Sequence, residues 1–217
     1  MTLLATLVSF FPLSVLVLLL ASIWYCIRVP DGWNLLLPIG IVYLYPVLAF
    51  RFLSLFKPLS EGRFELTEKK YNAWWGSHQF QLIYFACPFL EGLLRTLPGV
   101  YSAWLRLWGA RIGKQVYWTP NVEIDDRPLV EIGDGVIVGH KVHFISHVIL
   151  PYKDRLSLYI KKISIGKGCF LGAGSRLGPG VVVDDGTTLP VLTDGHVNQH
   201  FSGDQIRKKP EADARPE

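Results

Sequence analysis

A six-residue period runs through the second half of the chain and limits the folds that it can adopt. Counted in steps of six, one apolar residue recurs on both sides of a single interruption: Ile132, Val138, Phe144, Ile165, Leu171, Leu177, Val183 and Leu189. Ile112, Trp118 and Ile124 keep the same phase upstream, with two extra residues before Ile132. The residue after each apolar one is usually glycine or aspartate, and compact side chains follow four places on, among them Val136, Val142, Val148 and Cys169.

A period of six matches neither a helix nor a simple hairpin. Hexapeptide repetition is typical of a β-helix, in which one short strand and one turn form one side of a prismatic coil. Three hexapeptides close a coil, and coils must stack because one alone cannot bury its apolar face. The chain has enough repeats for about three to four coils. The alternative, a set of glycine-rich hairpins, is disfavoured because eleven positions keep the phase.

The composition predicts that part of the chain lies in a membrane. Half of the 217 residues are hydrophobic, which is high for a water-soluble protein. The net charge of +4 is modest and is not gathered in a basic run, so we expect no nucleic-acid partner. Cys26, Cys87 and Cys169 lie far apart, and this spacing supports neither a disulfide framework nor a zinc site.

Two apolar runs predict a transmembrane helical hairpin over residues 1–57. The first, Thr2–Ile27, carries no charge and is long enough to span a bilayer. A signal peptide is the alternative, but no basic residue precedes the run and the bulky pair Trp24-Tyr25 does not suit cleavage. The second run is Trp33–Phe50, in which Pro38 and Pro46 should produce bends.

The distribution of basic residues predicts how this hairpin is oriented. Arg28 alone precedes the second run, whereas several basic residues follow it: Arg51, Lys57, Arg63, Lys69 and Lys70. The positive-inside rule then places the N-terminus and the long C-terminal part in the cytoplasm. We expect a multi-pass protein of the inner (cytoplasmic) membrane whose C-terminal domain faces the cytoplasm.

Residues 58–108 predict helices that lie on the membrane surface. Gln79–Leu90 is apolar but too short for a span and contains Pro88, and Tyr101–Leu107 is amphipathic. The alternative is a soluble helical cap packed on the first coil. A β-helix domain should occupy residues 109–206, and the charged, proline-containing residues 207–217 predict a disordered tail.

Several repeats resemble a known superfamily. Ile-Gly-Lys-Gly-Cys at 165–169 and Leu-Gly-Ala-Gly-Ser at 171–175 resemble the hexapeptide-repeat acyltransferases of the left-handed β-helix superfamily. Leu-Trp-Gly-Ala-Arg-Ile-Gly at 107–113, after membrane helices, resembles the C-terminal membrane domains of polylysine-synthetase-like peptide synthetases and their stand-alone relatives. The resemblance implies a mainly β fold: a left-handed parallel β-helix, preceded by the transmembrane hairpin and the membrane-interfacial helical segment.

The interruption of the period is the expected place of the site, because a loop that leaves a rigid solenoid often carries function. It begins at Leu150, contains Lys153-Asp154-Arg155 and directly follows His140, His143 and His147. In the resembled enzymes a histidine before such a loop is the general base that activates the acceptor. His147 holds this position best and His143 is its rival, while Asp125 or Asp126, about one coil away, could orient the imidazole. The alternative is a histidine and acids that simply face solvent.

The resemblance also implies a donor site. In the resembled trimers the pantetheine arm of acyl-CoA lies between neighbouring subunits against a Gly-Ala-Gly-Ser turn. This implicates a run of five residues here: Gly172, Ala173, Gly174, Ser175 and Arg176. Alternatively, these glycines only form a tight turn.

The predicted function is therefore that of a membrane-anchored acyltransferase, and most specifically an acetyltransferase. It would use acyl-CoA as co-substrate and no metal, form a homotrimer, and act on a hydroxyl or amine of a small or lipid-linked acceptor near the membrane. A metal enzyme like the γ-class carbonic anhydrases fits poorly, because the only histidine upstream of His140 is His78, outside the repeats, so the spacing does not suit three converging ligands. A non-catalytic trimeric scaffold in a membrane biosynthetic complex is the main alternative.

Overall fold

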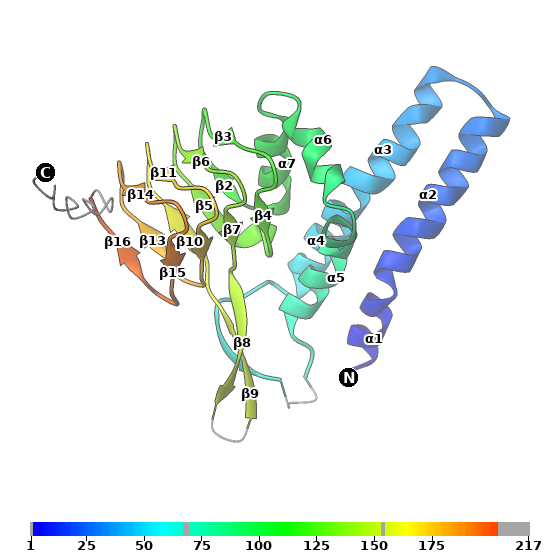
Figure 1. Cartoon of the computed structure of the whole chain (residues 1–217). Coiled ribbons are helices and arrows are strands. Elements are labelled where there is room, and N and C mark those ends of the chain that lie inside the picture. Colours follow the sequence, from blue (N-terminus) through cyan, green and yellow to red (C-terminus); the bar gives the residue numbers. More distant parts are fainter. Residues whose placement is uncertain (1, 67–69, 153–154, 204–217) are drawn as a thin grey trace, which may run out of the picture.

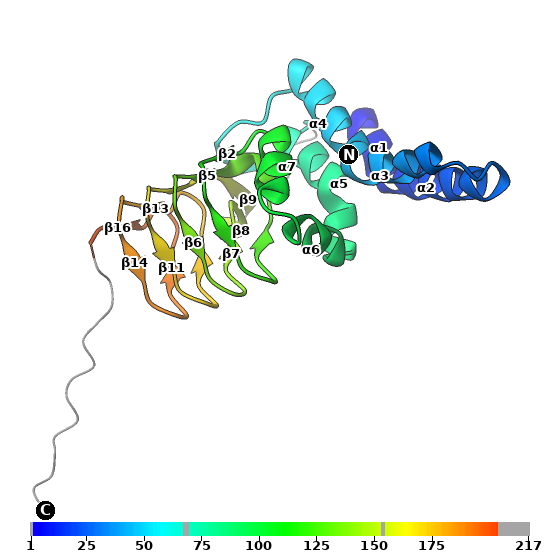
Figure 2. The ribbon, with the colours of Figure 1, turned by 90° about the horizontal axis from the view of Figure 1, so that it is seen from above.

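The computed structural model describes residues 2–66, 70–152 and 155–203. A β-helix occupies one end of the molecule, a layer of short helices covers its first coil, and two long helical arms project from this layer (Figure 1). The view from above in Figure 2 shows the arms pointing away from the coils. Lys153, Asp154 and the predicted tail at 207–217 lie outside the described residues.

The β-helix has three parallel sheets, as the six-residue period predicts. The first contains β2 (Arg111–Ile112), β5 (Val130–Ile132), β10 (Ile163–Ile165), β13 (Val182–Val183) and β16 (His200–Phe201). The second contains β3 (Tyr117–Trp118), β6 (Ile137–Val138), β11 (Phe170–Leu171) and β14 (Thr188–Leu189). The third contains β4 (Glu123–Ile124), β7 (His143–Phe144), β12 (Arg176–Leu177) and β15 (Asp194–Gly195).

Every in-phase apolar residue ends a strand and stacks on its equivalent in the next coil. In the first sheet Ile112 is in register with Ile132, Ile132 with Ile165, and Ile165 with Val183. These side chains are buried, so the stacked column forms the apolar core of the coil. The period also continues to Phe201, which is buried and in register with Val183. The described residues therefore form four full coils and one further strand.

The corners of the coil bring backbones of neighbouring coils very close together. At Gly172 an added Cβ would lie 2.3 Å from the carbonyl carbon of Pro190 in the next coil. A glycine is therefore required there for a steric reason, in addition to any role of the turn in binding.

The interruption is a β-hairpin, and the prediction of a loop there is wrong in this respect. Strands β8 (His147–Tyr152) and β9 (Arg155–Ile160) pair antiparallel and extend away from the coil (Figure 1). Strand β1 (Gly62–Glu65), from far upstream, adds to β9 as a third antiparallel strand. Val148 belongs to this hairpin and not to the repeat. Backbone pairing makes the segment an ordered arm rather than an irregular loop.

The N-terminal part forms two apolar helical arms. The first is α1 (Leu3–Ser9) and α2 (Phe11–Arg28), which together are long and apolar enough to cross a membrane. After η1 (Gly32–Leu35) come α3 (Leu36–Tyr43) and α4 (Tyr45–Phe56), which are bent by 46° and could form a broken span or a re-entrant loop. Pro46 stands in the first turn of α4, where proline is tolerated, and thus marks the bend. Pro38 lies in the first turn of α3 and produces no bend within it.

Residues 70–108 form α5 (Ala73–Ala86), α6 (Phe89–Arg95) and α7 (Val100–Trp108). Trp108 is fully buried and shares one core cluster with Ile112 of the first coil and Phe50 of α4. The helices thus cap the coil, which was the alternative arrangement. Phe89 and Leu93 of α6 remain exposed, and a position of this helix on a membrane surface stays a prediction.

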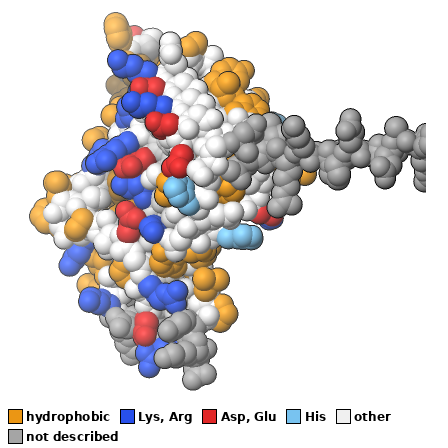
Figure 3. All heavy atoms as spheres, turned by 90° about the vertical axis from the view of Figure 1, so that its left-hand side faces the viewer, with side chains coloured by type: hydrophobic (Ala, Val, Ile, Leu, Met, Phe, Trp, Pro, Cys, Tyr) orange, Lys and Arg blue, Asp and Glu red, His pale blue; other side chains and the backbone are white. Residues whose placement is uncertain are grey.

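Acidic and basic side chains alternate over the end of the coil that Figure 3 faces. On the outer surface of the first sheet, Glu131 pairs with Lys162 at 2.7 Å and with Arg111 at 3.2 Å.

Candidate active site

His147 and Asp126 form a hydrogen-bonded pair where the hairpin leaves the coil. Nδ1 of His147 lies 2.6 Å from Oδ2 of Asp126. The imidazole is 17% exposed, whereas the carboxylate is completely buried. With the carboxylate ionised, Nδ1–H donates to it and Nε2 carries the lone pair. This hydrogen bond joins His147 to an aspartate upstream of it and leaves the second ring nitrogen available for a proton.

Asp126 is held by helix α5 as well as by the coil. The indole Nε1 of Trp74 donates to its Oδ1 at 3.0 Å, so both carboxylate oxygens are bonded. The ring of Trp74 also packs on the imidazole of His147, with centroids 4.6 Å apart. The backbone N–H of Arg127 donates to the side-chain oxygen of Gln81, also on α5, at 2.9 Å. These contacts fix both members of the pair from one helix.

A buried ion cluster anchors this helical layer to η2 (Arg127–Leu129), the short helix that directly follows Asp126. The guanidinium of Arg127 is 2% exposed and donates from Nε to Oε1 of Glu91 at 2.6 Å. Arg95 binds the other carboxylate oxygen of Glu91 at 2.9 Å. Arg127 also lies over the ring of Tyr84, 4.9 Å from its centroid. The two-residue insertion in the sequence therefore folds into a turn that places Asp126 inward and Arg127 against the helices.

The pKa of His147 is set by two opposing effects. Burial lowers it, but the hydrogen bond and charge of Asp126, helped by the charge of Asp125, raise it more, so the pKa stands above the usual value. The raised pKa makes the imidazole a stronger base, and Asp126 would stabilise the imidazolium that forms when it takes up a proton.

His143 has a separate aspartate partner. Its Nε2 lies 2.7 Å from Oδ1 of Asp125, and its Nδ1 lies 3.9 Å from Oε2 of Glu123. Burial lowers the pKa of His143, but the hydrogen bond and charge of Asp125 outweigh this and raise it. Both ring nitrogens thus face acids, which suits a proton acceptor less well than the arrangement at His147. His140 is exposed at a turn.

The sequence reasoning missed Trp74, His78 and Gln81, because they lie on a helix outside the repeat. His78 stands one turn after Trp74, and its ring centroid is 6.3 Å from that of His147. Its Nδ1 is buried and has no hydrogen-bond partner among the described residues. Burial lowers the pKa of His78, against the opposing charge of Asp126. A signal was present, since Trp74 and His78 are spaced for one helix face.

The residues of the predicted donor turn are close together but apart from His147. Ser175 is fully buried and its hydroxyl donates to the carbonyl of Gly172 at 2.7 Å, while Gly174 has a φ of 72°. Arg176 is exposed, binds Asp194 at 2.7 Å and is in register with His143. Ala173 is half-buried within the same turn. This turn has a structural role in the stacking of the coils, and its contact with a donor stays a prediction.

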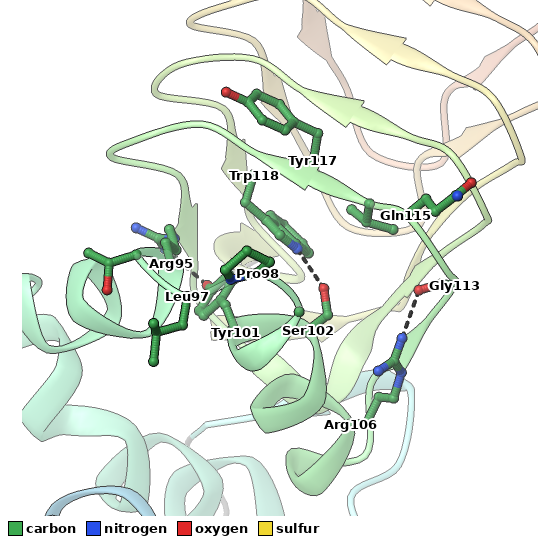
Figure 4. A pocket seen from close by; sticks show the side chains of 13 residues that line it. Arg95, Leu97, Pro98, Tyr101, Ser102, Arg106, Gly113, Gln115, Tyr117 and Trp118 are labelled. Atoms are coloured by element: carbon green, nitrogen blue, oxygen red, sulfur yellow. Dashed lines mark hydrogen bonds between the residues drawn. The ribbon is translucent and has the colours of Figure 1, made fainter.

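Two hollows lie between the helical layer and the first coil. Figure 4 shows the smaller one, of about 610 Å³, where Trp118 Nε1 donates to Ser102 Oγ at 2.8 Å and Arg106 donates to the carbonyl of Gly113 at 2.7 Å. None of the described residues that line it is a histidine or an acid. The larger hollow, of about 920 Å³, is lined by Phe85 and by Asp125, the partner of His143, but neither His143 nor His147 lines it. In the described part of the chain, no cluster of three or more histidine, cysteine or acidic side chains is placed to hold a metal ion.

Comparison with known proteins identifies a related biosynthetic enzyme. The putative colanic acid biosynthesis acetyltransferase WcaF of Escherichia coli K12 is 29% identical over 116 residues, which cover 42% of this chain and 64% of that protein. The protein of the same name from Shigella flexneri matches to the same extent. The chain thus spans less than two thirds of these relatives. No family model matches.

Two solved structures also resemble the chain. A galactoside acetyltransferase in complex with coenzyme A has a TM-score of 0.36 and 16% identity over 53% of this chain and 75% of its own. A maltose O-acetyltransferase from Clostridium difficile 630 has a TM-score of 0.33 and 16% identity over 67% of this chain and 89% of its own.

The hexapeptide phase, the closed three-sided coil and the similarity to the WcaF proteins agree with one another. The chain thus resembles the hexapeptide-repeat acyltransferases in its repeat and in its sequence similarity to the WcaF proteins.

Proposed function

We propose that the chain is a membrane-anchored acyltransferase that moves an acyl group, most specifically acetyl, from acyl-CoA to a hydroxyl or amine of an acceptor near the membrane. The observation that carries this proposal is the pair formed by His147 and the buried Asp126 at the root of the hairpin. The similarity to acetyltransferases supports the reaction class.

In this reaction Nε2 of His147 takes the proton from the acceptor as its oxygen or nitrogen attacks the thioester carbonyl. Asp126 keeps Nδ1 protonated, so that Nε2 is the basic nitrogen, and stabilises the imidazolium that forms. The tetrahedral intermediate then collapses, the C–S bond breaks, and the proton on Nε2 passes to the leaving thiolate. The acceptor attacks directly, so the reaction needs no cysteine or serine nucleophile.

The donor would lie along the coil against the turn from Gly172 to Ser175, with Arg176 near the phosphates of CoA. In a trimer this turn would face a neighbouring subunit.

The apolar arms would anchor the enzyme in the inner membrane with the coil in the cytoplasm. Their exposed surface supports this role: Leu7, Leu20 and Ile27 of the first arm are each more than 60% exposed. A contiguous apolar surface of this kind is costly in water and favourable in lipid. Such an anchor raises the effective concentration of membrane-bound acceptors at the site.

Binding of acyl-CoA to the full chain in lipid nanodiscs tests this proposal. Isothermal titration with acetyl-CoA, free CoA and longer acyl-CoAs should give saturable binding, with the preferred chain length identifying the donor. Failure of well-folded protein to bind any of them would overturn the proposal in favour of the scaffold alternative.

A further inference from the structure

A groove of about 920 Å³ separates the helical layer from the first coil. Its helical wall contains Phe85, Pro88 and Phe89, and its coil wall contains Tyr117 and Trp118. The lining is mainly apolar and aromatic, and the volume is that of a pocket for a ligand larger than a simple alcohol or amine.

Phe85 links the groove to the histidine base, although neither His78 nor His147 lines the groove itself. Phe85, which lines it, stacks on His78 with ring centroids 5.4 Å apart, and His78 in turn lies 6.3 Å from the ring of His147. Asp125 lines the groove from the coil side, and its charge acts on both histidines. Phe85 and His78 of α5 therefore connect the groove with His147.

Around Phe89 the groove is bordered by exposed apolar side chains. Phe89 is 64% exposed, and Leu93 and Leu97 beside it are 55% and 60% exposed. Of these three side chains only that of Phe89 lines the groove, and all three add to the exposed apolar surface of the helical layer. On the opposite side, the polar side chains of Asn121 and Lys141 are accessible. A ligand that satisfies both surfaces has a polar and a hydrocarbon part.

We propose that this groove binds the acceptor as a single-chain amphiphile. Its hydroxyl- or amine-bearing head lies at Asp125, and its hydrocarbon chain leaves over Phe89 towards the apolar arms. The assignment of this ligand as the acceptor rests on the proposed acyltransfer, whereas its binding in the groove does not.

A large side chain introduced at Gly92 should fill the groove. Gly92 lines the groove on α6, and a Cβ added there meets no atom within 4 Å. Gly92→Trp should therefore occupy the groove without disturbing the coil, and Gly92→Ala is the matched control that leaves it open.

The experiment uses the full chain in nanodiscs and a photoreactive dodecyl glycoside as probe. Labelled peptides are mapped by mass spectrometry, with unlabelled dodecyl glycoside, free glucose and dodecanol as competitors. We expect labelling at Phe85 or Phe89, at least about tenfold better competition by dodecyl glycoside than by either half, and at least about a tenfold loss in Gly92→Trp but not in Gly92→Ala.

Equal labelling of Gly92→Trp would overturn the proposal. If free glucose competes as well as dodecyl glycoside, the ligand is purely polar and the proposed amphiphile is wrong. If dodecanol competes as well as dodecyl glycoside, the groove binds a membrane lipid instead. His147→Ala should label like the unaltered chain, because binding needs no base. Acetyl-CoA binding is measured on the same samples. Labelling of the groove without acetyl-CoA binding would refute the proposed acyltransfer but keep the groove as an amphiphile site. Acetyl-CoA binding without labelling would refute only the proposed ligand of the groove.

Discussion

His147 and Asp126 are 21 positions apart in the sequence, yet Nδ1 of the imidazole lies 2.6 Å from Oδ2 of the carboxylate. The β-helix produces this contact by bringing the end of one coil over the end of the previous one. The carboxylate is fully buried and both of its oxygens are bonded, so its position is fixed before any substrate arrives.

Replacement of the base should abolish the reaction and leave the fold intact. We expect His147→Ala to lower the rate of CoA release by about 10²–10⁴-fold, which is the usual contribution of a general base. The rate is measured as release of the CoA thiol, either with an acceptor present or with water as the acceptor.

The other two histidines of the segment are the controls. His140→Ala, at an exposed turn, should behave like the unaltered chain, and His143→Ala should keep most of the activity. A severe loss in His143→Ala together with a mild one in His147→Ala would transfer the role to His143.

Asp126 should control the pH dependence. Because the pKa of His147 is raised, the base is protonated and inactive at low pH, and the acid limb of kcat/KM should lie above the ordinary value of about 6.5. Asp126→Asn removes the charge that raises this pKa, so the limb should move to lower pH while the maximal rate falls. An acid limb at the same pH in both proteins would show that another group titrates.

The buried ion cluster should be important for stability. Arg127→Met leaves Oε1 of the buried Glu91 without its guanidinium partner, and losing a partner of a buried pair costs about 3–5 kcal/mol. Denaturant unfolding followed by tryptophan fluorescence measures the loss. Arg176→Met breaks the exposed pair with Asp194 and should change the stability little. Similar effects of the two substitutions would contradict the role given to the cluster.

The corner of the coil at Gly172 should not tolerate a side chain. In Gly172→Ala the methyl group would meet the backbone at Pro190, and overpacking of this kind costs about 1–3 kcal/mol. The midpoint of thermal unfolding should fall. Gly92→Ala, on an open helix surface, should be neutral or stabilising by up to about 1 kcal/mol. An unchanged midpoint in Gly172→Ala would mean that the two coils can separate without cost.

The topology of the arms is open to chemical labelling in cells. In a background with the three native cysteines replaced by alanine, Asp31→Cys in the turn between the arms should react with a membrane-impermeant maleimide added outside the inner membrane. Lys114→Cys on the coil should react only after the membrane is opened. Reaction of both sites from outside would exclude the proposed orientation.

Much of the coil could be predicted from the sequence because its rule is local and repeated. A strand of two residues and a turn place each sixth side chain inward, so Ile132, Ile165 and Val183 stack whatever the rest of the chain does. The position of His147 before the interruption also follows from this count, since the repeat ends there. The count did not distinguish Asp125 from Asp126 as the partner of His147.

The tertiary structure decided the remaining features, because they depend on contacts between distant segments. The pairing of β1 with β9 turned a predicted loop into a three-stranded sheet, and no local pattern in either strand specifies that partner. The two residues inserted before Ile132 become part of η2, which buries Asp126. Trp74 and His78 reach His147 only because helix α5 packs on the first coil. The sequence alone thus determined the coil, through a short-range period, whereas the packing of apolar and charged side chains from separate segments determined the site.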